Sequence, residues 1–315
     1  MAIALLIIVA LPLLIAAGLV GYTLLNTHRA ERLVPREGRF VEVGGARLHY
    51  VEQGQGPAIL MVHGLGGQLR NFTYALTDRL AIDHRVIAVD RPGSGHSVAA
   101  PGLHPDLAGQ AALIVGVIDA LGLDRPLLVG HSLGGAIALA VALDHPEKIA
   151  GIALIAPLTH PLEGKISAAF KALLIPSPIV RRIVGWTLAA PLGHRHRAAG
   201  LRLVFGPEPA PADYESKGGG ALSLRPSNFF AASSEASQGM GEIVGLAARY
   251  PTLRVPIAIL FGRGDRILDP DFHGRRLAEA APGATLELID GGHMIPLTRA
   301  RETDAWLRRF LGTLR

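Results

Sequence analysis

The feature that most constrains the fold is a series of short apolar runs separated by stretches with helical periodicity. Such runs are too short for buried helices and are typical of strands that are covered on both faces. Their alternation with helical stretches predicts an α/β fold with a mixed, mostly parallel sheet. The apolar runs cover residues 58–62, 86–89, 126–129, 152–155, 255–261 and 285–289.

Turn residues predict a hairpin before these runs, and helical periodicity predicts helices between and after them. Residues 40–43 and 46–51 flank Gly44-Gly45 and predict a hairpin ahead of the sheet. We found no internal repeat. The predicted helices cover residues 106–121, 133–144, 270–280 and 297–311.

The alternation stops between residues 157 and 250, where Pro, Gly and basic residues mix with apolar clusters. We expect an inserted helical lid there, so the predicted divisions are 1–35, a core of 36–157 with 251–315, and a lid with its return helix over 158–250. Within the lid, apolar residues at helical spacing form a stripe, and Arg181 and Arg182 face away from it. The stripe indicates either packing on the core or an apolar wall for the substrate. The stripe consists of Ile179, Val180, Ile183, Val184 and Leu188.

The N-terminal segment is long and apolar enough to span a membrane. Residues 2–25 are almost wholly aliphatic, and 24 residues in a helix reach about 36 Å against a hydrocarbon core of about 30 Å. No basic residue precedes the run, which disfavours a cleaved signal peptide. Because the arginines follow it, the positive-inside rule places the domain in the cytoplasm, although these side chains can also pair with lipid head groups on either face. The arginines are Arg29, Arg32, Arg36 and Arg39.

Composition narrows the class of protein. The chain is 49% hydrophobic, which excludes a disordered chain. Its 31 basic and 26 acidic residues are scattered rather than clustered, so nucleic acid is not an expected partner. It has no cysteine, which excludes disulfides, thiolate metal sites and a cysteine nucleophile.

One motif places a nucleophile at the junction of a predicted strand and helix. Gly130-His131-Ser132-Leu133-Gly134 matches Gly-x-Ser-x-Gly immediately after the strand at 126–129. A tight turn there exposes the serine oxygen, and the flanking glycines leave room for neighbouring backbone. Ser132 is therefore the candidate nucleophile.

A serine nucleophile needs a base and an acid, which follow it along the chain. His293 comes after the last predicted strand, at the same sheet edge as Ser132, and is the candidate base. Asp265 follows the penultimate strand and is the candidate acid. Asp269 is the alternative, but Pro270 after it predicts a helix N-cap instead.

A glycine-rich segment after the strand at 58–62 predicts an oxyanion loop. His63, Gly64 and Gly66 surround Leu65, whose backbone N–H we expect to stabilise a developing oxyanion together with that of Leu133. We interpret His63 as structural, holding the loop through its ring nitrogens. Residues 90–95 predict a structural turn, with a role beside the pocket as the alternative.

These segments together resemble the α/β-hydrolase superfamily, in its serine esterase or lipase-like branch. The resemblance covers residues 39–315 and rests on segments 63–67, 90–95 and 130–135, on Asp265 and on Gly292-His293. It implies an eight-stranded sheet with a lid inserted after the sixth strand. Branches similar to epoxide hydrolases and haloalkane dehalogenases carry aspartate where this chain has Ser132, which disfavours those two activities.

The expected function is ester hydrolysis through an acyl-enzyme, without metal or organic cofactor. The anchor, the apolar stripe and the basic residues of the lid favour an amphiphilic or lipid-like substrate, and no obligate protein partner is indicated. One alternative is a carbon–carbon bond hydrolase of ring-cleavage products that uses the same three side chains. Another is a non-catalytic, membrane-tethered binding module. The basic lid residues are Lys165, Lys171, Arg181, Arg182 and Arg197.

Overall fold

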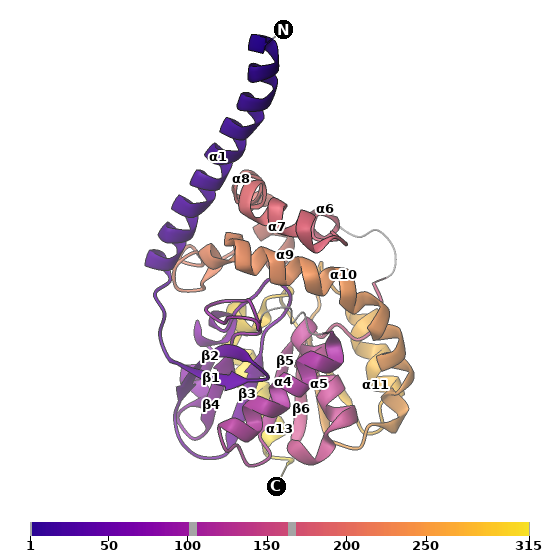
Figure 1. The fold of residues 1–315 in the computed structure, drawn as a ribbon. Coiled ribbons are helices and arrows are strands. Elements are labelled where there is room, and N and C mark those ends of the chain that lie inside the picture. Colours follow the sequence, from indigo (N-terminus) through magenta and orange to yellow (C-terminus); the bar gives the residue numbers. More distant parts are fainter. Residues whose placement is uncertain (1, 101–105, 163–167, 315) are drawn as a thin grey trace.

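The computed structural model describes residues 2–100, 106–162 and 168–314, so Lys165 lies outside the described residues. An eight-stranded sheet in the order β1-β2-β4-β3-β5-β6-β7-β8 confirms the predicted α/β-hydrolase fold (Figure 1). β3 to β8 run parallel, and β2 is antiparallel to β1 and β4. The strands are Arg39–Val43 (β1), Ala46–Gln53 (β2), Ala58–Val62 (β3), Arg85–Val89 (β4), Leu127–His131 (β5), Gly151–Ile155 (β6), Ile257–Gly262 (β7) and Thr285–Ile289 (β8).

Helices cover both faces of the sheet, as the continuous apolar runs require. Every residue of β5, β6 and β7 is buried, because α4 and α5 pack on one face and α3 and α13 on the other. The helices are Ala2–Leu33 (α1), Arg70–Thr73 (α2), Thr77–Leu80 (α3), Leu107–Ala120 (α4), Leu133–Asp144 (α5), Ala168–Lys171 (α6), Pro178–Thr187 (α7), Ala189–Arg195 (α8), Arg197–Phe205 (α9), Pro226–Ala248 (α10), Arg276–Ala280 (α11), Ile295–Thr298 (α12) and Ala300–Leu311 (α13).

Two predicted helices are interrupted. The stretch 270–280 opens with a wide π-type turn over Pro270–Arg275 before α11 begins. The stretch 297–311 begins earlier, at Ile295, and breaks at Arg299, whose backbone leaves the helical region between α12 and α13. Neither Gly nor Pro marks that break, so periodicity alone could not locate it.

The segment between β6 and β7 carries α6 to α10 and lies over one end of the sheet, with α10 crossing it (Figure 1). Arg181 faces away from the apolar stripe of α7, as predicted, but it is this face that is buried: Arg181 is only 2% exposed. Its guanidinium donates to the hydroxyls of Ser233 and Ser234 on α10. The apolar stripe consequently does not pack on the core: Ile179 is 71% and Ile183 58% exposed.

Helix α1 projects from the body and continues beyond the aliphatic run to Leu33 (Figure 1). Within it, Ala10–Leu33 is long and apolar enough to cross a membrane, with a mean hydropathy of 1.6 and 6% of the most apolar window buried. Its C-terminal end is attached to the inserted segment, where Ala30 and Val34 pack with Leu222. Contacts with α7 and α8 extend this attachment along the helix.

Candidate active site

Ser132 occupies the sharp turn that the glycine pattern predicts. It follows β5 directly, precedes α5 and has a φ of +55°, a left-handed conformation that non-glycine residues rarely adopt. A Cβ on Gly130 would lie 2.3 Å from the carbonyl oxygen of Gly134, and one on Gly134 would lie 2.1 Å from that of Val62. Both glycines are therefore required for the turn to sit against its neighbours.

The loop after β3 approaches the serine at Gly64. A Cβ there would lie 2.7 Å from Cβ and 3.2 Å from Oγ of Ser132. Gly66 in the same loop has a φ of +64° and faces Ala232 of α10. The backbone N–H groups of Leu65 and Leu133 donate no hydrogen bond to any of the described residues.

His293 lies in the turn after β8 and contacts both the acid loop and the serine elbow. Its Nδ1 is 2.7 Å from Oδ2 of Asp265. Its backbone oxygen accepts a hydrogen bond of 2.9 Å from Nε2 of His131, and the two imidazole rings are 4.9 Å apart. Because His131 is the residue before Ser132, the imidazole of His293 is held beside the elbow.

Asp265 is fixed by its own loop. Its Oδ1 accepts backbone hydrogen bonds from Ile267 and Leu268, which leaves Oδ2 for His293. The side chain of Asp265 is fully buried. Asp269 instead accepts from the backbone N–H of Phe272 as a helix cap, as predicted.

The structure thus joins Asp265 to His293 directly and places Ser132 next to them through His131. Across the described ranges, no hydrogen bond connects Ser132 Oγ with the His293 ring. The contribution of His131 could not be predicted from the motif, which leaves that position open. Burial, followed by the charge of His293, lowers the pKa of His131 to about 3, so its ring is neutral.

His63 is structural, as expected, and anchors the loop through both ring nitrogens. Nδ1 donates to the carbonyl oxygen of Gly64 at 2.8 Å, and Nε2 accepts from the backbone N–H of Arg91 at 3.0 Å. Complete burial, reinforced by the charge of Arg91, lowers the pKa of His63 to about 3. The imidazole is therefore neutral, consistent with one donor and one acceptor.

Arg91 connects the loop after β3, residues 63–67, to the inserted segment, a link that the sequence did not reveal. Its guanidinium donates to the carbonyl oxygens of His63 and Gly64 at 3.0 and 2.8 Å. The same group forms an ion pair with Glu235 of α10, and the side chains of both residues are buried. Burial raises the pKa of Glu235, whereas Arg91 opposes this rise.

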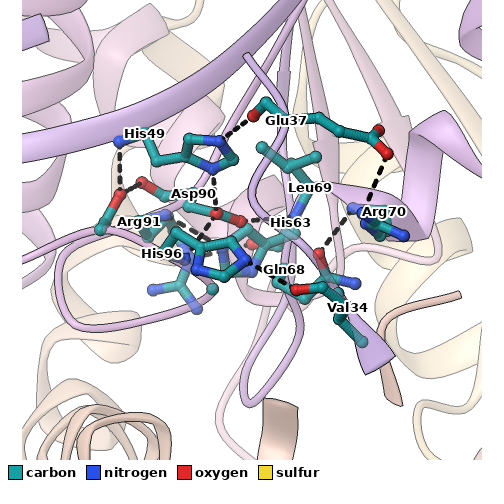
Figure 2. A network of polar contacts seen from close by, with 12 residues as sticks. Val34, Glu37, His49, His63, Gln68, Leu69, Arg70, Asp90, Arg91 and His96 are labelled. Carbon is teal, nitrogen blue, oxygen red and sulfur yellow. Dashed lines mark hydrogen bonds and ion pairs between the residues drawn. The ribbon is translucent and has the colours of Figure 1, made fainter. Parts of the chain in front are cut away.

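Asp90 organises the turn that follows β4 (Figure 2). Its carboxylate lies 2.7 Å from Nδ1 of His49 and accepts backbone hydrogen bonds from Leu69 and His96. Burial alone would raise its pKa, but these hydrogen bonds hold the pKa below its usual value. A Cβ on Gly95 would lie 2.1 Å from this carboxylate, which requires glycine there. The structural interpretation of residues 90–95 is supported.

Two cavities lie near residues discussed above. One of about 450 Å³ is lined by Asp265, His273 and Leu162. The other, of about 510 Å³, lies between the 92–99 loop, α7, α10 and the end of α1. Neither Ser132 nor His293 lines these two cavities. Over the part of the chain that the structure describes, no group of three His, Asp or Glu residues is arranged to hold a metal ion.

Known proteins similar to this chain span several activities. It is 30% identical over 291 residues to a dihydrolipoyllysine-residue acetyltransferase component of the acetoin cleaving system from Cupriavidus necator, covering 87% of this chain and 69% of that protein. It is 28% identical over 272 residues to haloalkane dehalogenase 2 from Mycobacterium tuberculosis, covering 84% and 91%.

A solved structure similar in fold also covers the N-terminal helix. The crystal structure of a membrane phospholipase A aligns with 100% of this chain and 97% of its own, at a TM-score of 0.69 and 24% identity. The model of the alpha/beta hydrolase family matches residues 59–306, from β3 into α13. The chain therefore belongs to the alpha/beta hydrolase family.

Proposed function

We propose that this chain is a serine hydrolase that cleaves carboxylic esters, with Ser132 as nucleophile, His293 as base and Asp265 as orienting acid. The observation that carries the proposal is the strained, left-handed Ser132 beside a histidine whose far nitrogen is bonded to a buried carboxylate. A binding module has no need of this arrangement, since it orients a base rather than a ligand.

The proposed reaction proceeds in two halves. Ser132 Oγ attacks the acyl carbonyl carbon while Nε2 of His293 takes its proton, and the N–H groups of Leu65 and Leu133 stabilise the oxyanion. His293 then returns that proton to the departing alcohol, leaving an acyl-serine. Water attacks this ester with the same proton exchange, which releases the acid and restores Ser132. These steps require no cofactor.

Ser132 also separates this proposal from the activity of the dehalogenase relative. The family resemblance assigns aspartate to the nucleophile position of such enzymes, and an aspartyl ester cannot form on serine. The acetyltransferase relative is closer to the proposed reaction. Acyl transfer and ester hydrolysis both move an acyl group from the substrate to an acceptor, which is water in hydrolysis. This supports acyl chemistry at Ser132.

We further propose that α1 anchors the enzyme in a membrane, that the inserted segment is its lid, and that the substrate is amphiphilic. The support is the apolar length of α1, its contacts with α7 and α8, and the exposed stripe on α7. Apolar side chains this exposed on a helix beside a membrane span favour a lipid environment.

A carbon–carbon bond hydrolase of ring-cleavage products would use the same three side chains. An arginine-lined pocket for the substrate carboxylate would favour it. The cavity with Arg36, Arg182 and Arg225 does not include Ser132, so it does not present a carboxylate substrate to the nucleophile. We therefore favour the ester.

Fluorophosphonate labelling of the purified protein tests the nucleophile. We expect labelling of the wild-type protein and none of Ser132→Ala, with kcat on a nitrophenyl ester lowered by about 10⁴- to 10⁶-fold. The matched control is Ser227→Ala on α10, which should label normally. Labelling that persists in Ser132→Ala would contradict the assignment, and turnover of a dienoate without ester hydrolysis would favour the alternative.

A further inference from the structure

The larger cavity lies where α1 leaves the predicted span and reaches the domain. Glu31 and Arg36 line it on the α1 side, and the loop at 92–99 lines it below. α7 contributes Arg182 and Trp186, and α10 contributes Phe230. Its volume of about 510 Å³ falls within the range of about 300–1,000 Å³ that small-molecule sites occupy.

The charges in this cavity are unbalanced in favour of cations. Its two carboxylates are already paired: Glu31 with Arg225 at 2.8 Å, and Glu235 with Arg91. Arg36 and Arg182 stack near aromatic rings but form no ion pair with any described residue. Two guanidinium groups are therefore available to an anion.

A further guanidinium, that of Arg225 in its pair with Glu31, is built into the wall. Arg225 is 8% exposed and donates to the carbonyl oxygen of Gly95, yet its Nε has no hydrogen-bond partner among the described residues. His96 beside it adds no charge near neutral pH, because burial and then Arg225 lower its pKa. A buried donor without a partner is costly.

The apolar side of the cavity points to an amphiphile rather than a small inorganic anion. Trp186, which lines the cavity, is 39% exposed, and Ile183 of the same helix is 58% exposed. Beside the end of an apolar span of 24 residues, an acyl chain would run along α7 while the head group meets the arginines.

We propose that this cavity is a second binding site, distinct from Ser132, for the anionic group of an amphiphile whose acyl chain lies against α7. Guanidinium groups bind phosphate and carboxylate alike, so both anionic phospholipids and free fatty acids share the required chemistry. The inference rests on the proposed membrane anchor, which is tested separately below.

Tryptophan fluorescence provides a local readout, because Trp186 lines the site and the other tryptophan, Trp306, is buried in the core. The full chain is reconstituted in phosphatidylcholine with a small fraction of one brominated lipid: phosphatidylglycerol, stearate or phosphatidylcholine. We expect saturable quenching by at least one anionic lipid beyond that by brominated phosphatidylcholine, and loss of this excess in Trp186→Phe. Which anionic lipid quenches identifies the source.

The charge requirement is tested by two matched double variants. Arg36→Gln with Arg182→Gln should weaken the anionic quenching at least about tenfold. Arg195→Gln with Arg202→Gln removes two exposed arginines outside the cavity and should leave the anionic quenching unchanged. Equal quenching by charged and neutral lipids, or equal loss in both double variants, would overturn the proposal. Flotation with plain phosphatidylcholine vesicles tests the anchor independently, and Ser132 labelling tests catalysis.

Discussion

At the scale of single residues, buried neutral histidines couple stability to pH. Burial lowers the pKa values of His63 and His131 to about 3 and of His273 to about 4. In the unfolded chain these groups bind protons near pH 6.5, whereas in the folded chain they do so only far below it. The unfolded state therefore holds more protons between these limits, and stability falls as pH decreases from about 6.5.

We predict that His63→Asn makes this pH dependence shallower. Removing one such histidine should reduce the slope of the unfolding free energy by about 1.4 kcal/mol per pH unit around pH 5. Urea unfolding in neutral detergent at pH 7, 6 and 5 measures both slopes. The slope of the unfolding free energy against pH is informative even if the variant is less stable at all three pH values. Equal slopes would show that His63 is protonated in the folded protein.

A second prediction concerns the close approach of Gly64 to Ser132, the proposed nucleophile. Gly64→Ala places a methyl group 2.7 Å from Cβ of Ser132, so the loop or the elbow must move. We expect the free energy of unfolding to fall by about 1–3 kcal/mol. We also expect kcat to fall more than in a control variant that adds a methyl group in open space. Gly200→Ala is the control, because a Cβ there meets nothing within 4 Å. Gly122 is equally open, but its φ of +59° would strain an alanine.

The candidate site residues differ in whether a local sequence pattern marks them. Ser132, Asp265 and His293 could be named as candidates from the sequence because each follows a strand, and His63 because it opens a glycine loop. The link between Arg91 and Glu235 spans 144 residues and depends on how α10 lies over the sheet. No local pattern encodes that distance, so only the tertiary structure reveals it.

At the scale of elements, this ion pair joins α10 to the loop after β3. Glu235→Ala leaves the buried Arg91 unpaired, which we expect to cost about 3–5 kcal/mol. Glu215→Ala is the matched control, because Glu215 pairs with Arg197 near the surface and should cost at most about 1 kcal/mol. Urea unfolding measures both. A cost for Glu235→Ala no larger than the control would mean that water reaches the Arg91 guanidinium.

The strands were predicted closely, and 58–62 and 285–289 match β3 and β8 residue for residue. The run of β3 reflects burial directly, whereas β8 lies at the edge of the sheet and is only partly buried. The orientation of α7 was not predicted, since an apolar stripe normally faces protein. Here Arg181 and Gly185 form the buried face, and Arg181 is satisfied by hydroxyl groups of α10. Amphipathicity identifies two faces of a helix but not which of them meets solvent, protein or lipid.

At the scale of the whole molecule, α1 lies against α7, the helix that carries the exposed apolar stripe. α1 lies beside α7 and α8 (Figure 1). The span ends beside the cavity that residues of α1 and α7 line. If α1 crosses a membrane, α7 is held at its surface, and the stripe is buried in the head-group region. The exposed Ile179 and Ile183 are then a docking face rather than a defect of packing.

This arrangement predicts that charging the stripe separates activity on vesicles from activity on soluble esters. Ile179→Asp with Ile183→Asp should lower hydrolysis of a long-chain ester in vesicles at least about tenfold, because two carboxylates oppose insertion of that face. Hydrolysis of nitrophenyl butyrate in detergent should stay within about twofold. Val244→Asp introduces a charge at an equally exposed apolar position near the other end of α10 and should change neither rate. Parallel losses on both substrates would indicate that α7 shapes the catalytic site itself, and unchanged rates on vesicles would mean that this face never meets the lipid.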